Sequence, residues 1–182
     1  FPNGSMADRW GADNAGAWNL ELGDIEPALT LLDRPGTENV HLAVPRFATT
    51  AAASGATIVR GVPAMRIGDQ LVTTVFDVVA AHLGVARDGL PGDWPSSYDD
   101  ADSPGTPAWQ SSITGVSPEV VIRIAREFAA NAEATNGRSM IVMGAGTNHW
   151  YHSDIIYRTM LNLLLLCGCQ GVNGGGWAHY VG

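Results

Sequence analysis

The residues with the clearest chemical potential lie in one segment, 137–154, which reads GRSMIVMGAGTNHWYHSD. An apolar run ends there in a glycine turn at 144–146, and Asn148 and His149 follow it. Glycines let a backbone come close to a flat or phosphorylated ligand, and amide and imidazole groups can hydrogen-bond the heteroatoms of a purine-like or pterin-like ring. The pattern fits a ligand-binding loop, and it fits a structural turn equally well.

Two more specific kinds of site are less well supported. The dinucleotide fingerprint G-x-G-x-x-G fails because His149 occupies its third glycine position. His149 and His152, with Asp154 nearby, form an H-x-x-H pattern, but on a loop this spacing does not direct both imidazoles to one zinc ion, and no third ligand is evident. Cys167 and Cys169 have no second cysteine pair, so we expect them to pack as small apolar side chains at a helix end.

A second glycine-rich segment, GCQGVNGGGWAHYVG, occupies residues 168–182. Its three consecutive glycines at 174–176 permit unusual backbone angles. A helix over 154–167 would be about 20 Å long and would carry the chain away from the first loop. The following residues can span that distance in an extended conformation, at about 3.3 Å each, so the second segment could join the same site.

The elements around the first loop predict an α/β layer. Residues 139–143 form a run that is apolar after Ser139, which is typical of a parallel strand covered on both faces. Ser117 followed by proline predicts the start of a helix that continues to about residue 134, with Glu119 and Arg123 as an i,i+4 ion pair. The order helix, strand, glycine loop, helix is the start of a doubly wound parallel sheet, in which ligands bind at the carboxyl ends of strands.

The helix after the first loop is expected to begin at Ser153 and to end before Gly168. Its apolar residues recur at helical spacing and should form the buried side. They are Ile156, Met160, Leu163, Leu164 and Cys167.

The N-terminal part of the chain predicts less regular structure. Residues 1–70 are rich in turn-forming residues, with a short strand at 18–22, and look like a wrapping extension without its own core. Thr74 and Asp77 have capping-box spacing and predict a helix that ends before a glycine at 84. That helix should bury an apolar face of Val75, Phe76, Val79 and Leu83. A Pro/Gly/Asp-rich connection at 88–109 follows. We therefore predict a loop-rich part, 1–112, and an α/β part, 113–182.

Composition excludes several classes of function. The net charge is −8 and all ten basic residues are Arg, without any run or stripe of them, so no nucleic acid is expected as a partner. No stretch approaches the roughly 20 apolar residues of a membrane span, which argues against direct membrane insertion. The start FPNGSMADRW lacks the features of a signal peptide and an initial Met, so we expect a piece of a longer protein.

Several segments resemble the molybdopterin oxidoreductase (dimethyl sulfoxide reductase) family, in particular its branch of respiratory nitrate reductase alpha subunits. The similar segments are GRSMIVMGAGTNHWYHSD, LLLLCGCQGVNGGGWAHYVG, TPAWQSSITGVSPEVVIRIAREFA, LVTTVFDVV and PNGSMADRWGADNAGAWNLE. The resemblance covers nearly the whole chain and is weakest at about 36–66. Its GAGTNHW and GGGWAHYVG stretches are specific to the nitrate reductase branch.

The resemblance implies a very large subunit with a molybdenum bis(molybdopterin guanine dinucleotide) cofactor and one iron–sulfur cluster, which reduces nitrate to nitrite. Electrons from quinol would arrive through an iron–sulfur beta subunit and a haem-containing membrane gamma subunit. The alpha subunit would be cytoplasmic and attached peripherally to the cell membrane through the membrane subunit.

By this similarity, the first loop would lie against one of the pterin cofactors, with Asn148 and His149 as the side-chain contacts. A β-carbon at Gly144 or Gly146 would obstruct that approach, or would demand an unfavourable angle if φ is positive. The predicted cofactor-binding residues are Gly144, Ala145, Gly146, Thr147, Asn148, His149, Trp150, Gly174, Gly175, Gly176, Trp177 and His179.

The molybdenum-ligating Asp and the His/Cys cluster ligands of that family have no match in this chain. We therefore predict no catalytic residue and no metal ligand, and we expect an internal fragment that is inactive and binds no cofactor by itself. Two alternatives stay open. One is a nitrite oxidoreductase of the same family, and the other is a stand-alone binding module that keeps the fold without catalysis.

Overall fold

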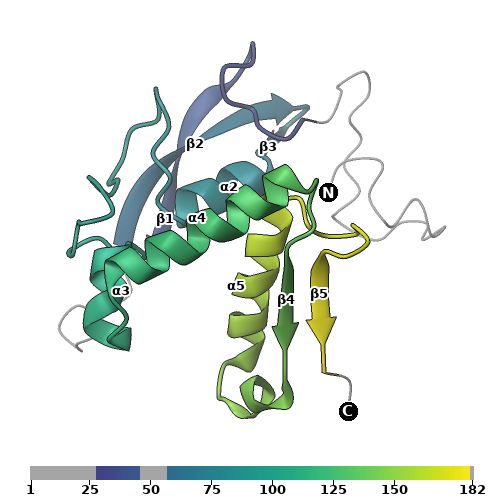
Figure 1. Cartoon of the computed structure of the whole chain (residues 1–182). Coiled ribbons are helices and arrows are strands. Elements are labelled where there is room, and N and C mark those ends of the chain that lie inside the picture. Colours follow the sequence, from purple (N-terminus) through teal and green to yellow (C-terminus); the bar gives the residue numbers. More distant parts are fainter. Residues whose placement is uncertain (1–27, 46–56, 181–182) are drawn as a thin grey trace. The chain divides into compact units, whose positions relative to one another are not determined.

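The computed structural model describes residues 28–45 and 57–180 (Figure 1). The chain forms two compact units, Phe1–Gln110 and Ser111–Gly182, and the boundary falls within the helix α3 (Pro107–Thr114). The strand predicted at 18–22 lies outside the described residues. The boundary between these compact units does not test the predicted domain division after residue 112, which stays a prediction.

A three-stranded antiparallel sheet in the order β1-β2-β3 forms the centre of the first unit. Its elements are β1 (Glu38–Pro45), β2 (Thr57–Ile67), β3 (Gln70–Val72) and the helix α2 (Val75–His82), which lies against β2. The central strand supplies the core, since Val62 and Ala64 are each 1% exposed. The prediction of an irregular extension without a core is therefore wrong for residues 38–45 and 57–70.

Two turn-forming residues in the middle of β2 concealed this strand. Gly61 is needed because a later loop runs against it: its N–H donates to Pro91 O at 2.6 Å, and a β-carbon there would lie 2.7 Å from that oxygen. Pro63 lies beyond the pairing with β3, which involves only residues 65–67 of β2. On that side Pro63 occupies an edge position, where proline is tolerated in a sheet.

The helix α2 begins as predicted, with Thr74 Oγ1 accepting a hydrogen bond from Asp77 N at 3.0 Å. It also ends as predicted, because Gly84 adopts the left-handed conformation that closes helices (φ +79°). The predicted apolar face is only partly correct. Phe76 and Val79 are half-buried, but Val75 is 63% exposed and Leu83 47%, whereas Asp77 is fully buried. Helical spacing alone did not reveal that a carboxylate faces the interior.

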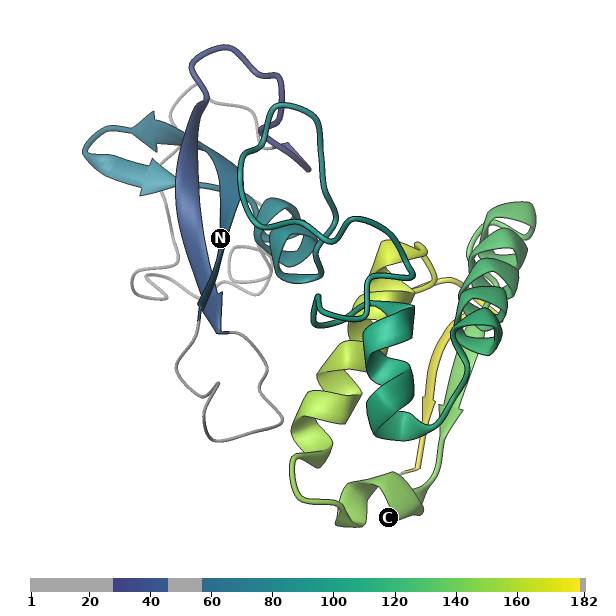
Figure 2. The same ribbon diagram turned by 90° about the vertical axis from the view of Figure 1, so that its left-hand side faces the viewer.

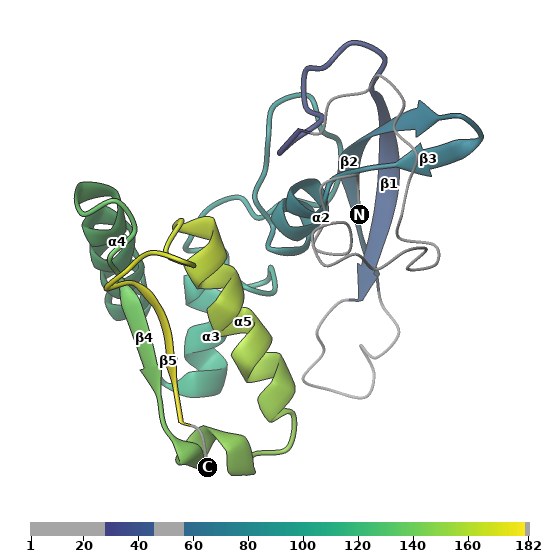
Figure 3. The ribbon, with the colours of Figure 1, turned by 90° about the vertical axis from the view of Figure 1, so that its right-hand side faces the viewer.

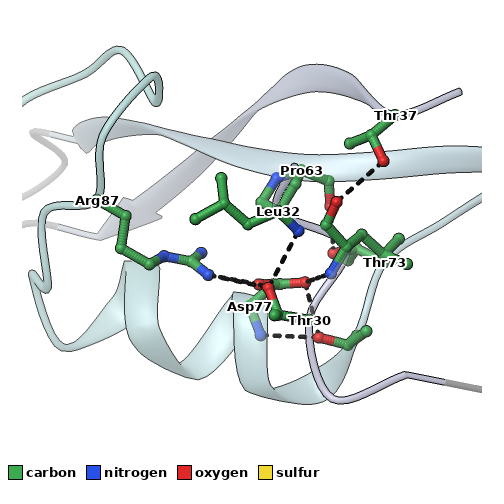
Figure 4. A network of polar contacts seen from close by, with 9 residues as sticks. Thr30, Leu32, Thr37, Pro63, Thr73, Asp77 and Arg87 are labelled. Atoms are coloured by element: carbon green, nitrogen blue, oxygen red, sulfur yellow. Dashed lines mark hydrogen bonds and ion pairs between the residues drawn. The ribbon is translucent and has the colours of Figure 1, made fainter. Parts of the chain in front are cut away.

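Four hydrogen-bond donors surround the buried Asp77 carboxylate (Figure 4). They are Thr30 Oγ1 at 2.6 Å, Leu31 N at 2.9 Å, Thr74 Oγ1 at 2.8 Å and Arg87 Nη1 at 2.6 Å. Burial raises the pKa of Asp77, but the hydrogen bonds from Thr30, Arg87, Leu31 and Thr74 outweigh burial and hold that pKa below its ordinary value. The carboxylate therefore connects α2 to the segments on either side of it.

The predicted connection at 88–109 ends in a helix that the sequence analysis missed. Thr106 Oγ1 accepts a hydrogen bond from Trp109 N at 3.1 Å, which starts α3. Earlier in the connection, the backbone N–H of Ser96 donates to Asp100 at 3.0 Å. This and further hydrogen bonds from neighbouring residues lower the pKa of Asp100 to about 2. The connection is thus an ordered set of turns.

The second unit contains a β-α-β unit. Its elements are α4 (Pro118–Ala134), β4 (Met140–Met143), the 3₁₀ turn η3 (Ala145–His149), α5 (Ser153–Leu166) and β5 (Gly176–His179). The two strands pair in parallel, with Met140 opposite Gly176 and Met143 opposite His179. Figures 2 and 3 show α5 running beside them in the opposite direction. The predicted mixed α/β class is confirmed.

The two long helices have the predicted limits. Ser117 is the N-cap of α4, and α5 starts at Ser153. The side of α5 predicted to be buried is correct: Leu164 is fully buried, while Leu165 beside it is 61% exposed. Within the described residues, no helix is long and apolar enough to cross a membrane.

Two details of this unit differ from the sequence-based expectation. The predicted ion pair of Glu119 and Arg123 is not the one that forms, because Arg123 pairs with Glu127 at 4.0 Å. The strand β4 is not covered on both faces, since Val142 is 78% exposed while Met143 is 8% exposed. One face of the parallel pair is therefore open to solvent in the described residues.

The core of the second unit lies where α4, α5 and the following turn meet. It consists of Ala132, Leu164 and Cys169, with Phe128, Ile141, Cys167 and Trp177 packed against them. The two cysteines are packing residues, as predicted, and burial raises the pKa of the Cys167 thiol. Backbones approach closely here: a β-carbon at Gly137 would lie 2.5 Å from Gly168 O.

Candidate functional site

The predicted glycine turn is present at the carboxyl end of β4. Gly144 has φ −96° and ψ 175°, and η3 follows it directly. His152, with φ 66°, then begins α5 without a side-chain capping hydrogen bond. Helix N-termini present backbone N–H groups, which favour negatively charged ligand groups. The segment 144–152 thus has the geometry of a loop at the ligand-binding edge of an α/β layer.

A polar network joins this loop to the carboxyl end of β5. The Tyr157 hydroxyl, in α5, donates to Asn148 Oδ1 in η3. His179 Nε2, at the end of β5, lies 2.8 Å from the same hydroxyl oxygen. Trp177 lies beside both rings, with centroids 5.4 Å from Tyr157 and 6.1 Å from His179. Side chains from η3, α5 and β5 therefore converge at one edge.

The single hydroxyl hydrogen of Tyr157 determines how this network is polarised. Because that hydrogen is donated to Asn148 Oδ1, the hydroxyl oxygen must accept from His179, whose Nε2 then carries a proton. In neutral His179, Nδ1 is left as an acceptor, while the Asn148 amide nitrogen is a donor. Neither atom has another partner within residues 28–45 and 57–180. The edge therefore offers one donor and one acceptor to a ligand.

The glycines of the first loop border an open hollow of about 580 Å³, whose lining is uncharged. The hollow is lined by Gly144, Gly146, Thr147, Trp150 and Ile156. A β-carbon at Gly144 or Gly146 would meet no atom within 4 Å, and neither residue has a positive φ. Nothing within the described chain requires glycine at these two positions. Close approach of a ligand to the backbone is a physical reason for glycine at both positions.

The second group of predicted glycines lies at the opposite end of the strands. Gly176 pairs with Met140, at the amino end of β4, whereas His179 lies at the carboxyl end. A β-carbon at Gly175 would lie 2.1 Å from Gly137 O, so close packing of backbones explains that glycine. The structure therefore brings Asn148 and His179 together but separates both from residues 174–176.

The remaining predicted residues are accessible at this edge. Asn148 and His149 are exposed, and Trp150 is 70% exposed. The residue that sequence reasoning missed is Tyr157. Its signal was a hydroxyl-bearing aromatic residue in the first turns of the helix that follows the loop, the position from which a side chain reaches back towards both strand ends.

The chemistry available at this edge is binding and orientation. Within the described residues, no group of three or more His, Cys, Asp or Glu side chains is arranged to hold a metal ion. The uncharged lining of the hollow suits a planar heterocycle, and the Asn148–Tyr157–His179 network, whose residues do not line the hollow, offers polar groups at the same strand ends. An organic cofactor fits these residues, whereas a metal would need ligands from elsewhere.

Comparison with known proteins identifies the class to which this fold and site belong. The family model for molybdopterin oxidoreductase matches residues 31–181. The chain therefore belongs to the molybdopterin oxidoreductase family. Within the family, its whole length is similar to nitrate reductase alpha subunits: it is 52% identical to the one of Mycobacterium tuberculosis and 43% identical to the respiratory nitrate reductase 1 alpha chain of Escherichia coli.

The chain spans about 15% of the length of these relatives. A shorter match, 46% identical over 77 residues, is to the perchlorate reductase subunit alpha of Dechloromonas aromatica, and it covers 42% of this chain and 8% of that protein. The resemblance to the nitrate reductase branch is thus confirmed over the whole chain.

Proposed function

We propose that this chain is part of the catalytic alpha subunit of a respiratory nitrate reductase and forms part of the cradle of its molybdopterin guanine dinucleotide cofactor. The cradle is the edge at the carboxyl ends of β4 and β5. Support comes from the family match and from relatives named nitrate reductase that align with every part of the chain.

The observation that carries the proposal is the pair of glycines beside the hollow. Gly144 and Gly146 have ordinary φ values and free space where a β-carbon would be. Most glycines with a structural role are explained by a positive φ or a close neighbour, and these two have neither. A flat ligand lying against the backbone explains both, because a methyl group would then separate the ligand from the backbone.

In this proposal the bound cofactor supplies the two-electron redox chemistry of nitrate reduction at its molybdenum. Residues of this chain bind and orient the organic part. Asn148, His149 and Trp150 provide polar and aromatic contacts from the loop, and Trp177 and His179 provide them from β5. The predicted roles of the glycines at 174–176 stay predictions, and their place at the opposite end of β5 favours a packing role.

The wider assembly follows from the same proposal. The parent subunit would also hold an iron–sulfur cluster and would receive electrons from an iron–sulfur beta subunit and a haem-containing membrane gamma subunit. It would be cytoplasmic and peripheral to the membrane. The β4-α5-β5 unit would be the start of a doubly wound sheet, whose further strands would pair with these two.

The test compares a glycine beside the hollow with a glycine that is packed against another backbone. It uses both the 182-residue chain and the full-length subunit. Gly146→Ala adds a methyl group where no protein atom lies within 4 Å, so the thermal unfolding temperature of the 182-residue chain should not fall. In the full-length subunit the same methyl group should reduce the content of molybdopterin guanine dinucleotide and nitrate turnover.

Gly175→Ala is the matched control, because its β-carbon would lie 2.1 Å from Gly137 O. We expect it to lower the unfolding temperature of the 182-residue chain directly. If Gly146→Ala leaves cofactor content and turnover at wild-type values, the cradle does not include this edge and the proposal is wrong.

A further inference from the structure

The Tyr157 side chain connects the two halves of the candidate site. Its hydroxyl donates to Asn148 on η3 and lies 2.8 Å from His179 Nε2 on β5. Its ring is held separately, at a centroid distance of 5.4 Å from Trp177 and in an edge contact at 5.0 Å with His179. The hydroxyl and the ring therefore make different contacts, and they can be tested independently.

We propose that Tyr157 is the positioning residue of the candidate site, whose hydroxyl fixes η3 to the carboxyl end of β5. The proposal rests on the proposed function for its ligand, but the positioning itself is a property of this chain. Tyr157 acts through Asn148 and His179, and contact between Tyr157 and the ligand is not required.

The turn gains from such an attachment because the hydrogen bonds at its two ends are long. Thr147 N to Gly144 O and Trp150 N to Thr147 O are both 3.4 Å, beyond the usual range for N–H···O bonds. Within the described parts of the chain, the hydrogen bonds between η3 and β5 pass through the Tyr157 hydroxyl. Its loss should therefore loosen η3 selectively, and Asn148 and His179 would no longer be held relative to each other.

Tyr157→Phe is the direct test, because it removes the hydroxyl and keeps the ring contacts. Amide hydrogen exchange of Thr147 and Trp150 in the 182-residue chain should become about fivefold faster, as expected for the loss of the one hydrogen bond of ordinary strength that attaches η3 to Tyr157. Exchange in the last turn of α5, where Cys167 N donates to Leu163 O at 3.1 Å, should stay unchanged.

The matched control is Tyr151→Phe. Tyr151 is 89% exposed, and its ring makes an edge contact with His152, so its hydroxyl can be removed without affecting the network. Exchange of Thr147 and Trp150 should remain at the wild-type rate in this variant. Equal exchange rates for the two Tyr→Phe variants would overturn the proposal.

A second variant keeps the test valid if Tyr157→Phe affects folding. Asn148→Ala removes the η3 end of the network at an exposed position. It should accelerate exchange of Trp150 about as much as Tyr157→Phe does, and the double variant should be no faster than the faster single variant. If the effects of the two single substitutions on the exchange rate of Trp150 multiply in the double variant, the hydroxyl does not act through Asn148. That result would also overturn the proposal.

The full-length subunit separates this proposal from the proposed function. If positioning and function both hold, Tyr157→Phe lowers the content of molybdopterin guanine dinucleotide, while Tyr151→Phe does not. Faster exchange of Trp150 together with unchanged cofactor content would support positioning by Tyr157 and contradict the cofactor cradle. Unchanged exchange together with lowered cofactor content would contradict positioning and leave the cradle supported.

Discussion

Replacement of the buried carboxylate Asp77 by the isosteric amide in Asp77→Asn should strongly destabilise the first unit. Asp77 accepts four hydrogen bonds, and Arg87 Nη1, at 2.6 Å, supplies one of them. The Nε and Nη2 atoms of Arg87 are buried without hydrogen-bond partners in the described residues, so the guanidinium depends on this carboxylate. Removing one partner of a buried ion pair costs about 3–5 kcal/mol, and the amide also presents a donor where Leu31 N–H needs an acceptor.

Urea denaturation of the 182-residue chain, followed by circular dichroism, measures this cost. Asp69→Asn is the control, because Asp69 is exposed in the turn between β2 and β3 and should change the unfolding free energy by less than about 0.5 kcal/mol. The double variant Asp77→Asn/Arg87→Met should recover part of the loss, since it also removes the unpaired charge. A cost for Asp77→Asn as small as that of the control would refute the reasoning.

Three further predictions follow from the described residues. The folded-state pKa of Asp77 is lowered, so its contribution to stability is complete above the unfolded pKa of about 3.9 and is lost as pH falls through the folded value. The urea midpoint should therefore fall as pH is lowered from about 6 to about 2, and an equally steep fall in Asp77→Asn would contradict this. Leu164→Ala, at a fully buried position, should cost about 2–5 kcal/mol in the same assay, and a loss below about 1 kcal/mol would mean that the site is not core. The purified 182-residue chain should contain no stoichiometric molybdenum by metal analysis and reduce no nitrate, because its described residues offer no ligand group; stoichiometric metal would contradict this.

The helices and the loop after β4 could be predicted because local signals determine them. The capping hydrogen bond of Thr74, the Ser-Pro start of α4 at Ser117, the spacing of apolar residues in α5 and the glycine turn at 144 each act within a few residues. The sheet of the first unit was missed since Gly61 is explained by a loop about 30 residues later in the chain, with which it makes close contact.

The candidate site was predicted in part for the same reason. Asn148 was identified because it stands beside the glycine turn, and His179 because of a family resemblance. The hydroxyl of Tyr157 that joins them acts between residues nine and 22 positions away along the chain, and its position early in α5 is a local sign that does not identify these two partners. Buried Asp77 was missed likewise, because its partner Arg87 lies beyond the end of α2.

The open face and edges of the parallel pair have a consequence for handling the chain. The sheet of the second unit has two strands in the described residues, so β4 and β5 each present one unpaired edge, and Val142 of β4 is exposed on the face of the pair. Unprotected edges beside apolar side chains are templates for intermolecular strand addition. We therefore expect the 182-residue chain to self-associate as its concentration rises, and Val142→Lys, which places a charge on this surface, should improve its solubility without weakening its core.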